Sequence, residues 1–439
     1  MRLGSRAAHR RALSLALPLI AANVTVPLVG MVDTAVLGHL PEAHYLGAAA
    51  LGGVVFSFLY FSFAFLRTGT TGPVAQAHGA GDSREVKAAL YRALLMAVAL
   101  SLAMIALQLP IRWAAFQVLE AGPEVVAGAK TYVAVRIWCA PAVLVNFVLL
   151  GWFMGLQNTR TGLLLQVVIN VVNLALDLLF VFGFGWTVAG VAAATAIAET
   201  TGAALGLALA ARALRTMPGR VSKAHLLDRP KLRRQFALNR DIMIRTLVLI
   251  SCSSAFTALG ARFCELTLAA NAVLINFQIF MAYALDGFAN AAESLVGDAI
   301  GARDRQRLDD CLAATFAWSA GVALGFAFIY AAGGERLIAL LTDIAAVQEE
   351  ARRYLPWVIA GPLVSVWSFQ LDGVYWGAAR GRDMRNAMLL SAAGFALAAL
   401  IAVPPLGNHG LWLAYMVLMV LRALTLGLGM PNVLRSVAG

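Results

Sequence analysis

Apolar segments, each long enough for a membrane-spanning helix, alternate with short polar or Gly/Pro breaks along almost the whole chain. A helix rises about 1.5 Å per residue, so roughly 20 apolar residues cross the hydrocarbon core of a bilayer. The segments cover residues 13–39, 45–70, 88–110, 126–154, 161–184, 188–211, 236–261, 266–292, 310–331, 350–377, 386–404 and 409–430. This pattern predicts twelve transmembrane helices and an all-α polytopic membrane protein.

One long polar segment, residues 212–234, divides the twelve spans into two groups of six. The division predicts an N-terminal lobe over residues 1–211, a basic linker and a C-terminal lobe over residues 235–439. Most of the 34 Lys and Arg residues lie at the termini, in this linker and in the other even-numbered loops. The positive-inside rule therefore places both termini and the linker in the cytoplasm, and we expect a bacterial-type inner membrane.

The two groups of six spans are copies of one another. At a constant spacing of 222 residues, residues 79–82 match residues 301–304, and Gly151 matches Gly373. Because six is an even number, both copies enter the membrane in the same direction. The repeat predicts two six-helix lobes related by a pseudo-twofold axis along the membrane normal. Such a pair of lobes is typical of an alternating-access transporter.

The fifth apolar segment, residues 161–184, carries a polar stripe that its counterpart in the second copy lacks. Gln166, Asn170, Asn173 and Asp177 fall at i, i+4, i+7 and i+11, on one face of a helix. An ionisable group inside a membrane span is costly, so Asp177 is a candidate functional residue. Gln166 and Asn170 suit either the same site or hydrogen bonding between helices.

Residues at a similar depth in other spans extend this candidate site. Asp33, Tyr132 and Thr195 lie, like Asp177, roughly 10 Å inside the predicted outer ends of their spans. Two carboxylates in an apolar lobe cannot both stay ionised cheaply, so we expect one of them to take up a proton. Glu199, one turn beyond Thr195, either joins this network or pairs with a neighbouring helix.

The second lobe has intramembrane acids of its own. Asp286 begins a polar stripe on the eighth span, and Asp372 lies in the aromatic segment 367–376, which includes Trp367 and Gln370. A carboxylate among aromatic rings suits a bulky organic cation, so these four residues are candidate substrate-binding residues. The alternative is that the aromatic rings face lipid or pack in the core.

Three of the arginines within predicted spans bear on the intramembrane acids. Arg67, Arg136 and Arg422 are candidate counter-ions for the intramembrane acids. Arg67 is near the inner end of its span, where a long basic side chain reaches the headgroup region by snorkelling. The alternative role for these arginines is a structural ion pair with an acid.

Composition supports the membrane prediction and excludes other classes. The chain is 61% hydrophobic and 13% charged, which is far from a soluble globular domain. The net charge of +11 is explained by topology, so we expect no nucleic-acid partner. The Cys and His residues show no metal-ligand or disulfide spacing, so no cofactor or firm metal site is expected. The first apolar run is too long for a cleaved signal peptide and predicts a retained span.

Several motifs resemble those of one transporter family. They are VPLVGMVDTAVLGHL at residues 26–40, NRDIMIR at residues 239–245, and the acids within YALDGFA and QLDG. Together with the twelve-span plan, they resemble the multidrug and toxic compound extrusion (MATE) transporters, in particular the DinF-like branch. The resemblance covers essentially the whole chain. It implies export of amphipathic, usually cationic compounds in exchange for H+ or Na+. We expect the protein to be a monomer.

The resemblance also implies residue roles in the N-terminal lobe. The family's acid of span 1 matches Asp33, and its Tyr of span 4 matches Tyr132. Its Asn and Asp of span 5 match Asn173 and Asp177, and its Thr of span 6 matches Thr195. These five residues coincide with the layer inferred from depth and repeat asymmetry. The NorM-like branch instead has an acid in span 7, where this chain has TLVLISCSSAF, although Asp372 matches that branch's acid of span 10.

The coupling ion is left open by the residues themselves. Asp33, Asn173, Asp177 and Thr195 supply carboxylate, amide and hydroxyl oxygens, which suit either a Na+ ion or a bound proton. We favour H+, because protonating one of two acids in an apolar lobe costs less than dehydrating Na+. The competing readings are a Na+-coupled antiporter, a lipid-linked precursor flippase and a membrane-embedded enzyme. No catalytic or Walker A motif supports the last.

Overall fold

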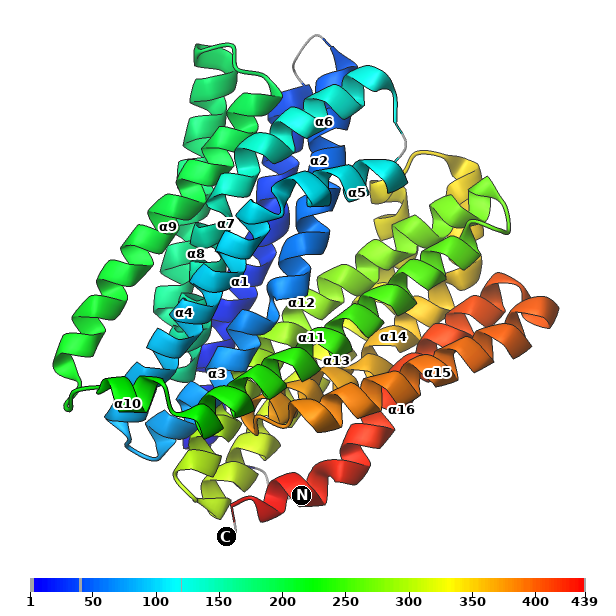
Figure 1. Ribbon diagram of the computed structural model, residues 1–439. Helices are drawn as coiled ribbons and strands as arrows, with labels where there is room; N and C mark the ends of the chain where they lie inside the picture. Colours follow the sequence, from blue (N-terminus) through cyan, green and yellow to red (C-terminus); the bar gives the residue numbers. More distant parts are fainter. Residues whose placement is uncertain (1–3, 39–41, 120, 438–439) are drawn as a thin grey trace. The chain divides into compact units, whose positions relative to one another are not determined.

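The computed structural model describes residues 4–38, 42–119 and 121–437, without the side chains of residues 24, 26–34, 43 and 118. The described chain is helical and contains no strand. The elements are α1 (Arg6–Gly38), α2 (Ala43–Phe63), α3 (Phe65–Gly79), α4 (Ser83–Ala106), α5 (Gln108–Val118), α6 (Pro123–Arg136), η1 (Ile137–Cys139), α7 (Ala140–Gly155), α8 (Thr159–Leu178), η2 (Leu179–Gly183), α9 (Val188–Thr216), α10 (Lys223–Leu226), α11 (Arg229–Gly260), α12 (Glu265–Gly301), α13 (Arg305–Leu341), α14 (Ala345–Gly377), α15 (Gly381–Leu406) and α16 (Asn408–Arg435) (Figure 1).

The predicted membrane spans correspond to these helices. Ten helical stretches of the described residues are long and apolar enough to cross a membrane. Helices α1 and α14, of 33 residues each, account for the first and tenth predicted spans. The all-α, twelve-span fold class is therefore confirmed. Several helices extend beyond the predicted apolar segments, because polar residues at a helix end continue the helix outside the hydrocarbon core.

The chain forms two compact units. One contains residues 21–232, and the other contains residues 1–20 and 233–439. We refer to them as the N-lobe and the C-lobe. Helix α1 contributes to both, since its first residues Ala8, Ala12 and Leu15 pack in a core cluster with Phe288 and Leu295 of the C-lobe. The sequence-based division at the linker assigns this N-terminal part of α1 to the N-terminal lobe.

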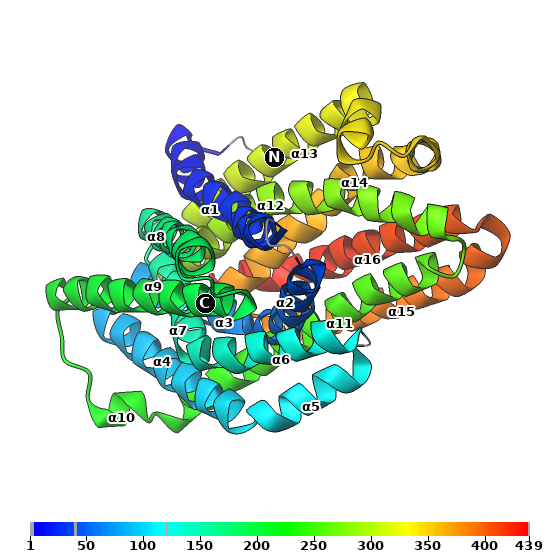
Figure 2. The ribbon, with the colours of Figure 1, turned by 90° about the horizontal axis from the view of Figure 1, so that it is seen from above.

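In the N-lobe, helix pairs α2 and α6, α3 and α7, and α8 and α9 pack along their lengths (Figure 2). Trp152 of α7 is fully buried and donates from Nε1 to the carbonyl oxygen of Val86 on α4, at 3.2 Å. This bond satisfies the indole N–H in the apolar interior. The bond ties α4 to α7, which in turn contacts α8 and α9.

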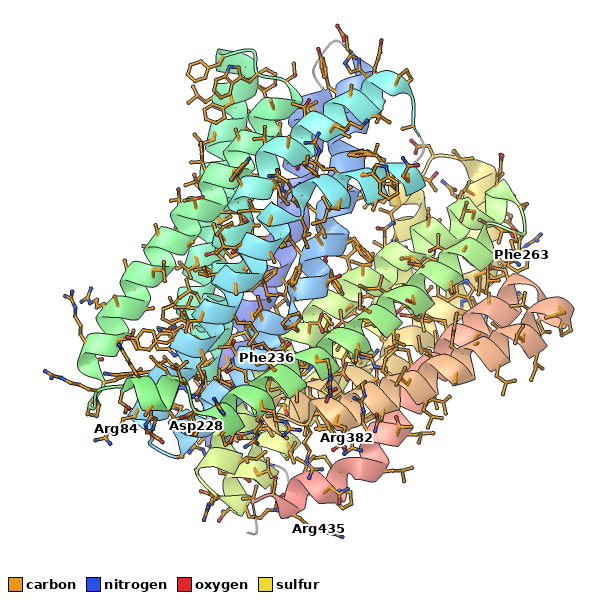
Figure 3. The ribbon with its side chains drawn as sticks, in the orientation of Figure 1. Arg84, Asp228, Phe236, Phe263, Arg382 and Arg435 are labelled. Carbon is orange, nitrogen blue, oxygen red and sulfur yellow. The ribbon has the colours of Figure 1, made fainter. Side chains whose placement is uncertain are left out.

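In the C-lobe, α12 packs closely on α14, and α15 and α16 form an antiparallel hairpin. Its largest core cluster includes the buried residues Phe256, Phe277, Tyr330 and Trp412. Figure 3 labels Phe263 at one end of this lobe and Arg382 and Arg435 at the other. Arg382 and Arg435 thus lie at the same end of the lobe.

The internal repeat is visible in close helix packing. A Cβ on Gly151 of α7 would collide with the carbonyl oxygen of Arg67, and a Cβ on Gly373 of α14 would collide with that of Ala289. Each pair is separated from its counterpart by the same 222 residues. Backbones can approach this closely only where the side chain is absent. The glycines are therefore repeated because the same helix crossing is repeated.

The short loops repeat in the same way. Gly81 and Arg303, at equivalent positions, both have a positive φ, of 69° and 53°. Each is followed by an aspartate that caps the next helix, Asp82 for α4 and Asp304 for α13. A left-handed conformation suits Gly but strains Arg. The second copy has kept the turn while losing the residue best suited to it.

Span 4 is interrupted where it approaches the candidate site. Helix α6 ends at Arg136, the short 3-10 element η1 follows, and α7 begins at Ala140. Such tightening within a span changes the direction of the side chains on either side of it. This break was not predicted from the sequence. Arg136, the last residue of α6, lines a cavity of the N-lobe together with Tyr132, one turn before it on the same helix.

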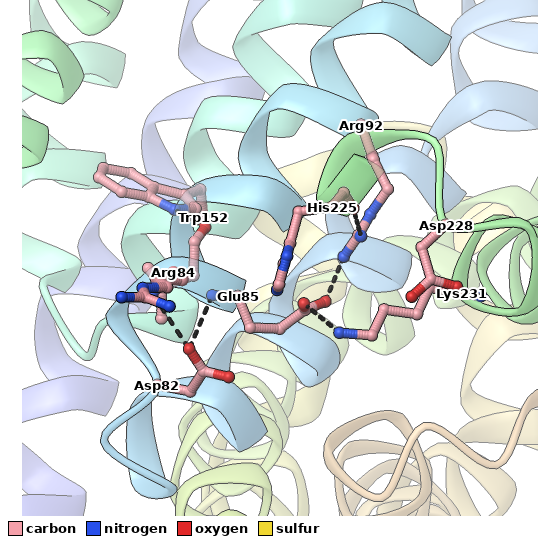
Figure 4. Close-up of polar contacts among 9 residues, drawn as sticks. Asp82, Arg84, Glu85, Arg92, Trp152, His225, Asp228 and Lys231 are labelled. Carbon is pink, nitrogen blue, oxygen red and sulfur yellow. Dashed lines mark hydrogen bonds and ion pairs between the residues drawn. The ribbon is translucent and has the colours of Figure 1, made fainter. Parts of the chain in front are cut away.

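The basic linker is fixed to α4 of the N-lobe (Figure 4). Glu85 is bonded by Arg92 and by Lys231, the latter at 2.6 Å. Arg92 also donates to the carbonyl oxygen of His225, at 3.2 Å. Lys87 donates to the carbonyl oxygen of Gly219, at 2.9 Å. The linker is therefore an ordered part of the N-lobe up to the unit boundary.

Candidate functional site

The polar stripe of the fifth span lies on α8 and connects to two other helices. Gln166 donates to the side chain of Asn170, at 2.9 Å, and Asn170 donates to the carbonyl oxygen of Thr25 on α1, at 3.4 Å. Asn173 donates to the hydroxyl of Thr195 on α9, at 3.4 Å. The i, i+4, i+7 spacing thus joins α8 to α1 and α9 through amide side chains.

Of the two acids predicted for this site, the structure describes the side chain of Asp177 but not that of Asp33. Asp177 lies on α8 one turn beyond Asn173 and is fully buried, with a relative exposure of 0%. Asp33 is within α1, but its side chain lies outside the described residues. The described part of the predicted set, Tyr132, Asn173, Asp177 and Thr195, is buried throughout.

A cavity of about 420 Å³ in the N-lobe is lined by three of these residues, Tyr132, Asn173 and Thr195. Its polar lining consists of Ser57, Tyr132, Arg136, Gln166, Asn170, Asn173, Thr195 and Glu199. Its apolar lining comes mainly from α2, α8 and α9. The structure therefore places Tyr132, Asn170, Asn173, Thr195 and Glu199, from three predicted spans, around a single space.

One wall of the cavity carries a positive charge. Arg136 donates from a terminal nitrogen to the hydroxyl of Tyr132, at 2.5 Å. Its guanidinium carbon lies 5.1 Å from the ring centre of Phe56 and 5.5 Å from that of Tyr132. Aromatic faces attract a cation at these distances. The guanidinium group is thus held by two rings and one hydroxyl.

Another wall carries a negative charge. Glu199 of α9 accepts a hydrogen bond from Nδ2 of Asn146, at 2.7 Å, and the same nitrogen lies 3.0 Å from the carbonyl oxygen of Glu199. Asn146 is on α7 and is buried. Of the two readings left open by the sequence, the structure shows Glu199 bonded to a neighbouring helix while still facing the cavity.

In the C-lobe, Asp372 of α14 is bonded by two arginines, Arg245 of α11 and Arg422 of α16. All three side chains are buried. The guanidinium carbon of Arg245 lies 5.4 Å from the ring centre of Trp376, and that of Arg422 lies 5.7 Å from the ring centre of Phe369. The acid and two aromatic faces of segment 367–376 are therefore already occupied by the protein's own cations.

The other candidate residues of the C-lobe are spread over the lobe. Asp286 is partly buried on α12, and its charge acts on Arg245. Gln370 is buried and accepts a hydrogen bond from Ser319, at 2.8 Å. Trp367 is 45% exposed and stacks on Phe316. Asp286 and Asp372 thus share Arg245 as a partner, while Trp367 and Gln370 have separate surroundings.

Sequence reasoning did not single out Arg245 or Asn146. Both are polar residues inside long apolar stretches, which is the signal that identified Asp177. Arg245 lies within the seventh predicted span, residues 236–261, and Asn146 is a lone amide without a polar stripe. Their importance comes from their partners on other helices, Asp372 and Glu199.

A polytopic helical membrane protein with two six-helix lobes and a polar cavity within one lobe belongs to the class of membrane transporters. The MatE family model matches residues 18–179 and 242–402, which is more than half of the chain. The chain belongs to the MatE family, and the resemblance to its DinF-like branch is confirmed by the relatives below.

The DNA damage-inducible protein F of Escherichia coli (strain K12) is 44% identical over 414 residues, covering 94% of this chain and 90% of that protein. The probable multidrug resistance protein NorM of Rhizobium meliloti (strain 1021) is 28% identical over 455 residues, covering 98% of this chain and 94% of that protein. An outward-facing structure of a multidrug resistance MATE family transporter aligns with a TM-score of 0.88 at 17% identity, covering 98% and 97% of the two chains. That likeness shows the fold.

Proposed function

We propose that this protein is a secondary antiporter that exports amphipathic, cationic compounds in exchange for H+, with its coupling site in the N-lobe. The observation that carries the proposal is the 420 Å³ cavity of the N-lobe, whose lining includes eight polar residues, among them Asn173, one helical turn from the fully buried Asp177. Burying a carboxylate inside a membrane protein is costly, so such a residue is expected where its charge has a function. Both termini and the linker are proposed to face the cytoplasm.

The proposed coupling residues are Asp33, Tyr132, Asn173, Asp177 and Thr195. Protonation from outside discharges the acids, allows the N-lobe cavity to shrink and accompanies release of substrate. The Asn173–Thr195 contact at 3.4 Å supports this role, since it links the two helices that line the cavity nearest Asp177. The proposed lobes are residues 1–211 and 235–439, and the transporter is proposed to act as a monomer.

The energetics allow such coupling. One proton that enters down a potential of 100 mV contributes about 2.3 kcal/mol, which supports roughly fiftyfold accumulation of a neutral substrate. For a monovalent cation exchanged one for one, the electrical contribution cancels, so the pH gradient supplies the driving force. The relative contributions of the membrane potential and the pH gradient to transport therefore depend on the charge of the substrate.

The test is efflux from sealed vesicles under one imposed gradient at a time. In sodium-free buffer, a pH gradient that drives protons in the direction opposite to substrate export should by itself drive export of a fluorescent lipophilic cation. The matched experiment imposes an equal Na+ gradient at a fixed pH on both sides. Transport that requires Na+ and ignores the pH gradient would refute proton coupling and favour Na+ at Asp33, Asn173, Asp177 and Thr195.

The C-lobe acids are proposed to influence substrate choice. Asp286→Asn and Asp372→Asn should each change the relative transport of a panel of cations. Asp372 has two guanidinium partners, so its effect on a bound cation would depend on movement of Arg245 or Arg422. Unchanged substrate profiles in both variants would show that these acids have only a structural role.

A further inference from the structure

The C-lobe has a groove that plays no part in the proposed function. Its volume is about 1090 Å³, and most of its lining comes from α13, α14 and α16. Helix α14 packs against both α13 and α16 (Figure 2). The volume exceeds the range of about 300–1,000 Å³ that is typical of small-molecule sites. The groove therefore has room for a larger, elongated ligand.

The lining changes from polar to apolar along the groove. The polar lining is Ser5, Arg305, Gln306, Asp309 and Asp310, of which the last four belong to the first turns of α13. The apolar lining includes Phe316, Trp367, Leu371 and Met430. Phe316 lies roughly 16 Å beyond Arg305 along α13, at about 1.5 Å per residue. Because the predicted ninth span begins at residue 310, the groove is polar at the membrane interface and apolar toward the membrane interior.

The aromatic part of the groove is open to its surroundings. Trp367 is 45% exposed, and its ring is stacked on that of Phe316, with 6.2 Å between the ring centres. Leu324 and Phe328, farther along α13, are exposed as well. Exposed apolar side chains within a membrane span contact acyl chains. Trp367, which was a candidate substrate-binding residue in the sequence, is therefore placed to contact lipid.

The polar end of the groove carries one guanidinium and two carboxylates. Arg305 donates from Nε to the carboxylate of Asp309, at 3.0 Å, and from a terminal nitrogen to the carbonyl oxygen of Leu434, at 3.1 Å. The Arg305–Asp309 pair is about half exposed on both sides, so it contributes little and can rearrange around a ligand. Among the described residues, the half-buried carboxylate of Asp310 has no hydrogen bond or ion pair.

The equivalent position in the N-lobe has the opposite charge and is covered by the chain itself. At the spacing of 222 residues, Lys87 of α4 corresponds to Asp309. Lys87 donates to the carbonyl oxygens of Met217 and Gly219 in the linker, at 3.0 and 2.9 Å. A carboxylate at this position accepts hydrogen bonds instead of donating them. The C-lobe groove therefore suits a partner that brings N–H donors.

We propose that this groove binds a phospholipid whose headgroup joins a phosphate to a primary ammonium group, as in phosphatidylethanolamine. The phosphate accepts hydrogen bonds from Arg305, whose side chain is 48% exposed. The ammonium group donates to Asp309 and Asp310, and an acyl chain lies along the rings of Phe316 and Trp367. The order of these groups along the groove matches the order of headgroup and chain in the bilayer.

The same charges select among phospholipid headgroups. Phosphatidylcholine carries the same two charges, but its quaternary ammonium has no N–H group to donate, so the carboxylates stay without donors. Phosphatidylglycerol has the phosphate without an ammonium group and meets two like charges. The expected order of affinity is therefore phosphatidylethanolamine, then phosphatidylcholine, then phosphatidylglycerol.

The test is a lipid titration of the full-length protein in detergent, without any gradient. The three phospholipids are supplied with identical brominated acyl chains, which quench tryptophan fluorescence on contact. Phosphatidylethanolamine should reach half-maximal quenching at a concentration at least about fivefold lower than phosphatidylcholine. Equal half-maximal concentrations for the three lipids would overturn the proposal, because the protein would then be solvated by lipid without selection.

Charge variants test the headgroup contacts. Asp310→Asn should weaken phosphatidylethanolamine binding about fivefold and leave phosphatidylcholine binding unchanged, and adding Asp309→Asn should remove the preference altogether. Asp310→Glu, which keeps the charge, should retain the preference. Asp343→Asn, which removes an exposed carboxylate outside the groove, is the matched control. A wild-type preference in the double variant would refute the assignment of the ammonium site.

A tryptophan variant locates the bound lipid. The chain has nine tryptophans, and Trp367→Phe should remove the quenching that appears at low phosphatidylethanolamine concentration. Trp113→Phe, which removes a 68% exposed indole on α5 of the N-lobe, should leave that quenching in place. Unchanged low-concentration quenching in Trp367→Phe would place the selective site elsewhere and refute the groove. These measurements involve no transport, so their outcome is independent of the proposed antiport.

Discussion

The two lobes are copies of one fold, yet they surround their intramembrane acids with different partners. In the N-lobe, Glu199 is bonded by the amide of Asn146 and faces a cavity. In the C-lobe, Asp372 is bonded by the guanidinium groups of Arg245 and Arg422. The repeat has thus preserved the helix crossings while the polar interior of each lobe has diverged.

This difference has a functional consequence. A carboxylate held by two permanent cations stays ionised, because protonating it would leave those cations uncompensated. A carboxylate held by neutral amides and hydroxyls lacks that restraint and can exchange a proton when its surroundings change. Ion coupling is therefore expected in the N-lobe, where an amide bonds the carboxylate of Glu199, and a static charge network is expected around Asp372 in the C-lobe.

The largest expected effect comes from neutralising an N-lobe acid. Asp177→Asn and Asp33→Asn should each reduce gradient-driven efflux to the level of protein-free vesicles, since the amide keeps the shape but carries no transported proton. Expression and melting temperature should remain close to wild type. Asp343→Asn, which removes an exposed loop carboxylate, is the matched control. Wild-type efflux in both N-lobe variants would contradict coupling in the N-lobe.

The second effect is on stability and belongs to the C-lobe. Asp372→Asn leaves two buried guanidinium groups without their carboxylate, which should cost about 3–5 kcal/mol and lower the melting temperature markedly. Adding Arg245→Met should recover part of that loss. Glu199→Gln should change the melting temperature far less, because Asn146 can bond the new amide.

The opposite result would reverse the roles of the lobes. If Asp372→Asn melts like wild type and changes only the set of transported cations, its two arginines are not static partners. Asp372 would then be a direct substrate-binding residue, as predicted from the aromatic segment around it. Thermal melting and a transport panel on the same preparation distinguish these results.

The sequence was sufficient to predict the spans, the repeat and the family, because these depend on long apolar runs and on residues at a fixed spacing. It also pointed to Tyr132, Asn173, Asp177 and Thr195, whose depth along each helix can be counted. It could not predict the partners of each charge. Glu199 was left between two networks, since helix spacing gives the face of α9 but not which neighbour supplies Asn146.

Local backbone geometry was a second limit. Span 4 is broken at η1, and nothing in the apolar pattern around it marks a 3-10 turn. The C-lobe prediction had a further limit. The sequence could not show that Arg245 and Arg422, which lie far apart in the chain, both bond Asp372. Their shared partner, Asp372, became apparent only when α11, α14 and α16 were placed together.

The smallest expected effect concerns two equivalent turns of the internal repeat and tests whether the two copies still have the same conformational requirement. Gly81 and Arg303 occupy the same left-handed turn, with φ of 69° and 53°. An L-residue in this conformation costs about 1–2 kcal/mol, part of which is offset because Gly adds entropy to the unfolded chain. Arg303→Gly should therefore raise the melting temperature slightly, and Gly81→Ala should lower it by a similar amount. A lower melting temperature for Arg303→Gly would mean that the arginine side chain stabilises its loop by more than its backbone strain costs.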